Sequence, residues 1–343
     1  MKTFFFLILI LALALPAACG PPPGEVEGHY NTGVGLQEQG YFEEAIAAYD
    51  EVIRLDPEHA QAYNNRGVAY LELGQLERAI KDYDEAIRLD PQHAQAYNSR
   101  GLAHFNLGQP ERAIQDYSEA IRLDPRYADA YNGRGLAYFN RGQLENAFKD
   151  FDEAIRLNPN HTDAYNGRGL AYLDRGQFVN AVKDFDEAIS LNPNHTDAYN
   201  GRGLAYFNLG QPENAVKDFT EAIRLDPGHA KAYNNRGYTY LNSDMFAPAI
   251  ADFSEAIRLD PNYARAYNNR GVVYASLSQF ERAVRDFSDA IRLDPGYAKA
   301  YSDRALVYTI TGKHAEAQQD IDRAVELGAD RTLLMEEISK FRK

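Results

Sequence analysis

The apolar positions of this chain fall into short helical stripes that end at turn-forming residues. Between residues 76 and 89, Ala79, Tyr83 and Ala86 recur at intervals of three and four, which is the spacing of one helix face. Pro91 then ends this stripe, because the residue before a proline is pushed out of the helical region. The pattern predicts an amphipathic helix over residues 76–89.

A second stripe precedes this one. Over residues 62–73, Tyr63, Gly67 and Tyr70 lie at helical spacing, and Gly74 supplies the permissive backbone on which helices commonly end. The two stripes therefore predict a pair of helices joined by a tight turn. No stretch of the sequence shows the strict alternation of apolar and polar residues that indicates a strand.

The helix pair recurs with a period of 34 residues. A fixed period of this length predicts a stack of similar units, which bury their core against their neighbours and present an extended surface instead of one pocket. The phrase Ala-Tyr-Asn-x-Arg-Gly begins at Ala62, Ala96, Ala130, Ala164, Ala198, Ala232 and Ala266. Alignment on this phrase gives nine repeats over 28–61, 62–95, 96–129, 130–163, 164–197, 198–231, 232–265, 266–299 and 300–330.

The residues at these positions resemble the tetratricopeptide repeat family. The resemblance extends over all nine repeats and implies an all-α, right-handed α-solenoid in which the first helix of each repeat lines the concave side. One departure is Arg66, because the family usually has an apolar residue just before the small glycine. In the second repeat the matching positions are Tyr63, Gly67, Tyr70, Gly74, Ala79, Tyr83, Ala86 and Pro91.

The last residues of the chain predict a helix that covers the end of the stack. Gly328 stands where earlier repeats have their Asp-Pro stop, and Thr332 is a residue type that caps helix N-termini. Leu334 and Ile338 follow at helical spacing. We therefore expect a cap helix over residues 331–343.

The first residues have the features of an export signal. Residues 1–18 contain a positive start at Lys2, an unbroken apolar run and small residues at the end, which is the pattern of a signal peptide. Cys19, the only cysteine, follows directly and resembles the lipidated cysteine of the bacterial lipobox, although Pro16 stands where that motif prefers leucine. The alternative is an ordinary cleaved signal with an incidental cysteine. Residues 19–27 then read as a tether.

Composition and motifs argue against several classes of function. The formal net charge of -14 disfavours nucleic acid as a partner, since phosphate binding needs a basic face. No histidine is tied by spacing to a nucleophile and an acid, and no glycine-rich loop lies between a strand and a helix. We therefore expect no catalytic residues and no cofactor.

Histidines recur in the loop between repeats, which raises the question of a metal site. Tyrosine fills the same position in other repeats, so the position selects a flat ring with a polar tip and favours packing at the helix junction over metal binding. The histidines are His59, His93, His161, His195 and His229, and the tyrosines are Tyr127, Tyr263 and Tyr297.

Arginine and aspartate form matching columns in the two helices of each repeat. The first repeat lacks both, with Thr32 and Ala48 at the two positions, and this joint absence predicts an Arg–Asp pair within each of the other repeats. The arginines are Arg66, Arg100, Arg134, Arg168, Arg202, Arg236, Arg270 and Arg304, and the aspartates are Asp82, Asp116, Asp150, Asp184, Asp218, Asp252, Asp286 and Asp320.

The opposite face of the first helices is the candidate peptide-binding groove. An exposed row of asparagines beside an apolar stripe suits an extended or helical peptide, with amides bonding its backbone and the stripe receiving its side chains. The alternative is that the stripe packs between neighbouring first helices. The asparagines are Asn64, Asn98, Asn132, Asn166, Asn200, Asn234 and Asn268, and the stripe includes Leu102, Leu136, Leu170, Leu204, Phe105, Phe139 and Phe207.

The edge of this groove changes sign along the stack. Three acids followed by three bases would orient a partner of opposite polarity, although recent copying of repeats could also produce the acidic run. The charged positions are Asp129, Asp163, Asp197, Lys231, Arg265 and Lys299.

These features together predict a non-catalytic scaffold or adaptor that binds proteins or peptides. The signal pattern and Cys19 place it in the bacterial cell envelope, in the periplasm or at the outer membrane, held by lipid. It resembles outer-membrane repeat lipoproteins that act as adaptors. Alternatives are a substrate-recruiting subunit of an envelope enzyme or secretion complex, and a self-assembling structural solenoid. The partner and the oligomeric state stay open.

Overall fold

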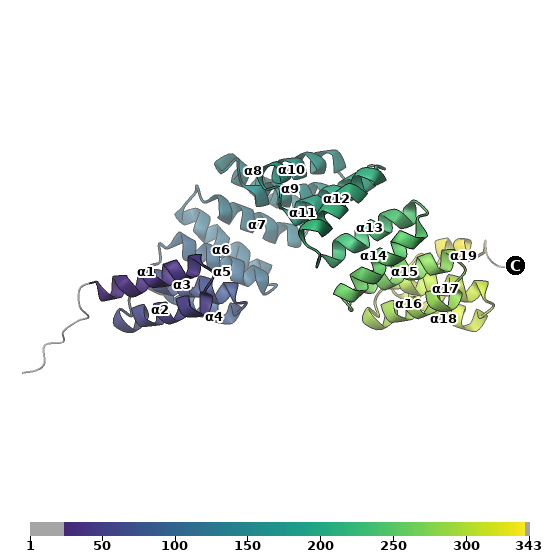
Figure 1. Cartoon of the computed structure of the whole chain (residues 1–343), viewed down its shortest axis with the longest axis horizontal. Coiled ribbons are helices and arrows are strands. Elements are labelled where there is room, and N and C mark those ends of the chain that lie inside the picture. Colours follow the sequence, from purple (N-terminus) through teal and green to yellow (C-terminus); the bar gives the residue numbers. More distant parts are fainter. Residues whose placement is uncertain (1–23, 340–343) are drawn as a thin grey trace, which may run out of the picture. The chain divides into compact units, whose positions relative to one another are not determined.

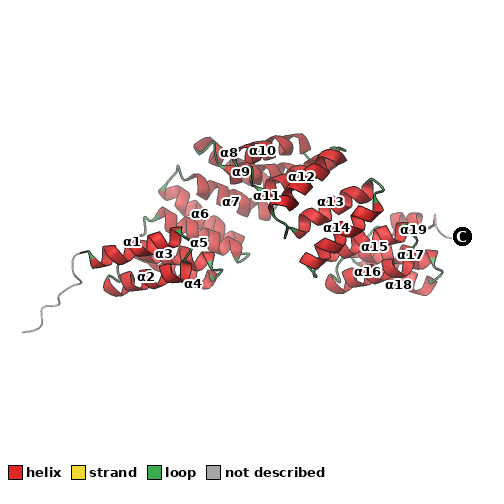
Figure 2. Cartoon of the chain, viewed as in Figure 1, coloured by secondary structure: helices red, strands yellow, loops and turns green. Residues whose placement is uncertain are grey.

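The computed structural model describes residues 24–339, and these residues form 19 α-helices and no strand (Figures 1 and 2). The all-α repeat solenoid predicted from the sequence is thereby confirmed. The helices are α1 Glu25–Glu38, α2 Phe42–Leu55, α3 Ala60–Glu72, α4 Leu76–Leu89, α5 Ala94–Asn106, α6 Pro110–Leu123, α7 Ala128–Asn140, α8 Leu144–Leu157, α9 Thr162–Asp174, α10 Phe178–Leu191, α11 Thr196–Asn208, α12 Pro212–Leu225, α13 Ala230–Asn242, α14 Phe246–Leu259, α15 Ala264–Ser276, α16 Phe280–Leu293, α17 Ala298–Ile310, α18 His314–Glu326 and α19 Arg331–Ser339.

The described chain divides into two compact parts. The N-terminal part contains α1 to α7 and ends at Gln143, and the C-terminal part begins at Leu144 and contains α8 to α19. Within each part the helices pack as antiparallel pairs, such as α3 with α4 and α11 with α12. Successive first helices, such as α9, α11 and α13, also contact one another.

Turn residues with left-handed backbone join the two helices of a repeat. Gly74 has φ 69° between α3 and α4, and glycines occupy the same place in most other repeats. Asp244 and Ser278 adopt φ values of 56° and 58° at the corresponding positions. A non-glycine residue in this region is strained, so these two turns carry a cost that the glycine turns avoid.

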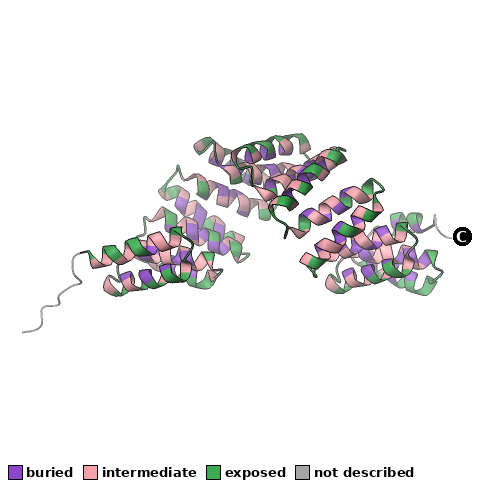
Figure 3. Cartoon of the chain, viewed as in Figure 1, coloured by how far each residue is buried: buried purple, intermediate pink, exposed green. Residues whose placement is uncertain are grey.

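An aromatic residue of each second helix forms the centre of its repeat. Tyr83 and Phe185 are fully buried, and Figure 3 shows the buried positions lining the inner faces of the helix pairs. A Cβ atom on Gly67 would lie 2.7 Å from the Tyr83 ring, so only glycine lets α3 approach α4 this closely. In the C-terminal part, a Cβ atom on Gly201 of the following repeat would lie 2.5 Å from the Phe185 ring, so this position also requires glycine.

The second helices have the bounds predicted from the sequence, whereas the first helices begin earlier than predicted. Helix α4 spans the predicted residues 76–89, whereas α3 begins at Ala60, two residues before the repeat boundary drawn at Ala62. The His59 side chain accepts a hydrogen bond from the backbone N–H of Ala62 at this start. The cap does not set the position, because α7 begins at the equivalent Ala128 after Tyr127, with no hydrogen bond from a capping side chain. Helix α1 begins at Glu25, so the last three residues of the segment assigned as a tether, 19–27, are helical.

The predicted cap helix is present as α19. Its residues Leu334 and Ile338 are buried against Ile321 of α18, which covers the last repeat. The capping residue is Asp330 and not Thr332, because the Asp330 carboxylate accepts hydrogen bonds from the N–H groups of Thr332 and Leu333. Residues 340–343 of the predicted cap helix lie outside the described residues, as do the proposed signal peptide 1–18 and Cys19.

Candidate functional site

The asparagine row does not form the exposed ladder expected from the sequence. Asn64, Asn132, Asn234 and Asn268 are buried, and the other three asparagines of the row, Asn98, Asn166 and Asn200, are partly buried. The physical reason is that successive first helices within each part contact one another and cover this position. The expectation of exposed amides for a bound peptide backbone was therefore wrong.

Several of these asparagines connect neighbouring first helices instead. The amide nitrogen of Asn235 donates to the Asn200 oxygen at 3.0 Å, and that of Asn269 donates to Asn234 at 3.0 Å. Each donor lies 35 residues beyond its acceptor, on the first helix of the next repeat. The asparagine row thus forms hydrogen bonds across repeat interfaces.

This hydrogen bond between repeats is absent where the residue 35 positions after the asparagine has no side-chain amide to donate. Gly133 stands 35 residues after Asn98, and Gly201 stands 35 residues after Asn166. The side-chain oxygens of both asparagines are buried and accept no hydrogen bond from the described residues.

The apolar stripe is partly packed and partly accessible. Most members are half-buried, among them Phe105, which packs against the core of the N-terminal part. Phe207 lies against Tyr238 of the next first helix, with the ring centroids 5.5 Å apart. Leu102 and Tyr238 keep 40% and 41% of their surface exposed. The packing alternative therefore holds for the half-buried members, while the role of the accessible members in binding a peptide stays a prediction. The half-buried members also include Leu136, Phe139, Leu170 and Leu204.

The charged edge of the groove is solvent-exposed in the C-terminal part. Asp163, Asp197, Lys231, Arg265 and Lys299 are all exposed, on first helices of five successive repeats. Asp129 is the exposed counterpart on α7 in the N-terminal part. The predicted change of sign thus lies on accessible side chains.

Loop histidines contact the acidic edge residues. His195 Nε2 lies 3.4 Å from an Asp163 oxygen, and His229 Nε2 lies 3.3 Å from an Asp197 oxygen. The hydrogen bond from His229 lowers the pKa of Asp197, and the same bond raises the pKa of His229. Each aspartate side chain still exposes 71% of its surface, so it remains available to a partner.

The histidines also cap helices, a role that the sequence analysis, which predicted packing at the helix junction, did not include. The Nδ1 atoms of His59, His93, His195 and His229 accept a hydrogen bond from the backbone N–H three residues later. Each ring therefore caps the following first helix, and the Nε2 atoms of His93, His195 and His229 face Gln61, Asp163 and Asp197 of the preceding repeat. Within residues 24–339 no group of three or more potential metal-binding side chains comes together.

The predicted Arg–Asp pairs are present, and each arginine also donates a further hydrogen bond, here called the second arm, to the preceding repeat. Arg168 donates through Nε and Nη2 to both oxygens of Asp184, at 2.8 Å each, in its own repeat. Its Nη1 atom donates to Asp152 of the preceding repeat at 2.6 Å. In other repeats a hydroxyl replaces this second acceptor, as Ser254 does for Arg270. The sequence indicated the first contact, while the second joins neighbouring repeats.

Comparisons with known proteins agree with this architecture. Three family models described as "Tetratricopeptide repeat" match the chain. The first matches residues 30–94, 98–162, 149–196 and 166–230, the second matches 230–263 and 264–297, and the third matches 298–330. The chain is therefore an α-helical repeat protein. It belongs to the tetratricopeptide repeat family, whose repeats generally act as non-catalytic scaffolds for protein–protein interaction.

Solved structures share the fold at low sequence identity. The APC/C hetero-tetramer Cut9-Hcn1 superposes with a TM-score of 0.68 at 17% identity over 83% of this chain, which spans 57% of the matched chain. A tetratricopeptide repeat protein from Parabacteroides merdae ATCC 43184 superposes with a TM-score of 0.58 at 22% identity, over 73% of this chain and 98% of that one. No curated protein sequence matches the chain.

Of the helices between residues 24 and 339, none has both the length and the apolar character needed to cross a bilayer.

Proposed function

We propose that this chain is a non-catalytic scaffold that binds a protein or peptide along the first helices of its C-terminal part. The observation that carries the proposal is the exposed edge that changes from Asp163 and Asp197 to Lys231, Arg265 and Lys299. It runs beside an apolar stripe from which Tyr238 projects. An edge of this kind selects a partner whose charges run in the opposite order.

The charged edge and the apolar stripe would contribute to binding in different ways. Exposed edge charges steer a partner and set its direction, and they influence the association rate more than the affinity. The accessible stripe residues supply apolar contacts, as in other grooves that hold an extended or helical segment. Asn200 and Asn234 contribute by accepting hydrogen bonds from the next first helix, which holds neighbouring first helices together and keeps this surface in place.

The proposal extends to location in the bacterial cell envelope. Its support is the signal pattern of residues 1–18 followed by Cys19, which resembles a lipobox. In this view the lipid on Cys19 anchors the scaffold, which resembles the envelope repeat lipoproteins. Cys19→Ser should release the protein from the membrane fraction into the soluble periplasm. Unchanged fractionation and the absence of an acyl mass on the mature N-terminus would remove the anchor from the proposal.

Capture from envelope extract tests the binding surface. The variant Lys231→Glu/Arg265→Glu/Lys299→Glu should lose a partner that the wild-type protein retains, and Tyr238→Ser should weaken capture separately. A matched control reverses three exposed bases on second helices, Lys149→Glu/Lys183→Glu/Arg285→Glu, with the same change in net charge. If the control loses the partner to the same extent, net charge and not the groove edge governs capture.

A further inference from the structure

A surface notch recurs where the start of one second helix meets the turn of the next repeat. The notch between α12 and the turn after α13 has a volume of about 360 Å³. It is separate from the groove surface, because none of the groove residues named above lines it. The residues lining this α12–α13 notch include Glu213, Val216, Lys217, Tyr240, Ser243 and Met245.

The corresponding notch between α8 and α9 is occupied by a side chain of the protein itself. Arg175 stands 68 residues before Ser243, two repeats away, and ion-pairs with Glu145, which is the counterpart of Glu213. The Arg175 guanidinium carbon lies 4.6 Å from the centroid of the Phe148 ring. An arginine therefore fits this site by one ion pair and one cation–π contact.

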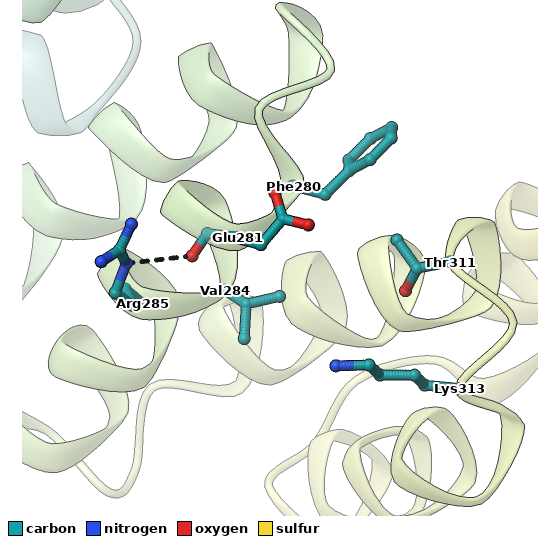
Figure 4. A pocket seen from close by; sticks show the side chains of 6 residues that line it. All are labelled: Phe280, Glu281, Val284, Arg285, Thr311 and Lys313. Carbon is teal, nitrogen blue, oxygen red and sulfur yellow. Dashed lines mark hydrogen bonds between the residues drawn. The ribbon is translucent and has the colours of Figure 1, made fainter.

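Two further notches show the same preference for a cation. In the N-terminal part, Arg141 Nε lies 3.2 Å from the carboxylate of Glu111, at positions equivalent to Arg175 and Glu145. The notch between α16 and the turn after α17 has a volume of about 270 Å³, and Lys313 lies along it (Figure 4). Its Nζ atom is 5.6 Å from the Tyr308 ring centroid.

The α12–α13 notch lacks such a cation and carries an additional acid. Ser243 replaces Arg175, and Met245 stands at the position of Lys313. Asp244 occupies the turn position that Gly176 has in the filled notch. Relative to the filled notch, the turn thus has one positive charge fewer and one negative charge more. Lys217 does not offset this difference, because the filled notch has Lys149 at the same place.

The apolar wall of the notch suits the stem of the missing side chain. Val216 is smaller than Phe148, its counterpart, and so leaves space beside Tyr240. Met245 is 49% exposed and closes the rim. The positive N-terminal end of α12 opposes a cation, but Glu213 in its first turn offsets that field, as Glu145 does for Arg175.

We propose that the α12–α13 notch binds an arginine side chain of a partner protein, in the position that Arg175 occupies in the α8–α9 notch. The partner's guanidinium pairs with Glu213, and its methylene stem lies against Val216, Tyr240 and Met245. This site goes beyond the groove proposal, since it is built from residues of α12, from Tyr240 near the end of α13 and from the following turn, none of which lines the groove.

Methionine methyl signals provide a direct test, because the chain has only three methionines, Met1, Met245 and Met335. Titration of the full chain, labelled at the methionine methyl groups, with N-acetyl-arginine amide should shift the Met245 signal in a saturable way. The Met335 signal on α19 should stay in place. A side chain tested alone should bind weakly, on the order of millimolar.

Matched probes and variants test whether binding needs the positive charge of arginine and the carboxylate of Glu213. N-acetyl-citrulline amide, which has the same shape without the charge, should shift Met245 at least tenfold less. Glu213→Gln should weaken the arginine response at least tenfold, whereas Glu281→Gln in the other notch should leave it unchanged. Ser243→Arg should fill the notch from within, so that the free variant has a shifted Met245 signal and no longer responds.

Three outcomes would overturn the proposal. They are an unmoved Met245 signal at saturating probe, an equal response to citrulline, and an equal response to N-acetyl-lysine amide, which would show a general cation site. Circular dichroism of each variant should match the wild type, since Glu213, Ser243 and Glu281 are all exposed. If capture through the groove fails while this titration succeeds, the two surfaces are shown to be independent.

Discussion

The two faces of the first helices follow different rules. On the packed face, Arg66 and its counterparts up to Arg304 donate to a buried aspartate of the same repeat in nearly identical geometry. On the groove edge the same helices carry acid, then base, and all of these side chains are exposed. Positions that the chain uses to hold itself together are repeated, while positions that face solvent vary from repeat to repeat.

The difference has an energetic origin. Asp184 is buried, so removing Arg168 would leave a carboxylate without compensation in a poorly solvated site. Asp197 on the edge remains hydrated whether or not His229 is present. The buried position therefore tolerates little change, and the edge is free to acquire a binding specificity.

Breaking the packed-face pair should have the largest effect on stability. Arg168→Ala and Asp184→Ala should each lower the free energy of unfolding by roughly 3–5 kcal/mol, because each leaves its partner unpaired. The double variant should cost clearly less than the sum of the two, as residues in direct contact are coupled. Urea denaturation of the four proteins measures this coupling, and simple additivity would show that the pair is not a unit.

Replacing a glycine that lies against an aromatic core residue should have the next largest effect on stability. Gly201→Ala places a Cβ atom 2.5 Å from the Phe185 ring, and we expect a loss of about 1–3 kcal/mol from overpacking. Gly35→Ala is the matched control in α1, where no atom outside the local backbone lies within 4 Å of the new Cβ. The control should stabilise α1 by up to about 1 kcal/mol. Thermal melts of both variants test this opposite sign.

The arm between repeats should contribute less than the pair within a repeat. Asp152 accepts from Arg168 but its side chain is 60% exposed, so Asp152→Ser should cost under about 1 kcal/mol. The protein already uses serine in this role, since Ser254 accepts from Arg270 at 3.0 Å. A loss as large as that of Asp184→Ala would mean that the two arms are equivalent.

The smallest effect should be a dependence on pH at the groove edge. His229 has a raised pKa, so its contribution is present below its ordinary value of about 6.5 and is lost as pH rises through the folded value. Asp197 has a lowered pKa, so its contribution is present above its ordinary value of about 4 and is lost as pH falls through the folded value. The pair therefore stabilises most between about pH 4 and 6.5.

Asp197→Asn should remove the extra stability that the His229–Asp197 pair gives between about pH 4 and 6.5. Within this range the difference in unfolding free energy from the wild type should be a few tenths of a kcal/mol, roughly as for other exposed ion pairs. It should shrink as the pH rises above this range through the folded pKa of His229, and as the pH falls below it through the folded pKa of Asp197. His93 provides the internal control, because its Nε2 atom faces the neutral Gln61 at 2.8 Å. Gln61→Ala should therefore shift stability by the same amount at every pH, and a pH-dependent change there would contradict the assignment.

Much of the architecture could be predicted from the sequence. The period of 34 residues defined the repeats, and the spacing of Ala79, Tyr83 and Ala86 with Pro91 predicted α4 at its observed bounds. The joint absence of arginine and aspartate in the first repeat predicted the packed-face pair. These features are local to one helix pair or repeat strictly along the chain, so they can be read without knowing how one repeat packs on the next.

The candidate site depended on contacts between repeats, which no single repeat encodes. The sequence placed Asn200 and Asn234 on the open side of their helices, but the contact between successive first helices turns them into partners of Asn235 and Asn269. The second arm of Arg168 and the empty position beside Glu213 likewise depend on which residue the adjacent repeat brings near. Helical periodicity determines which residues share a face, and only the packing of one repeat on the next decides whether that face meets solvent or protein.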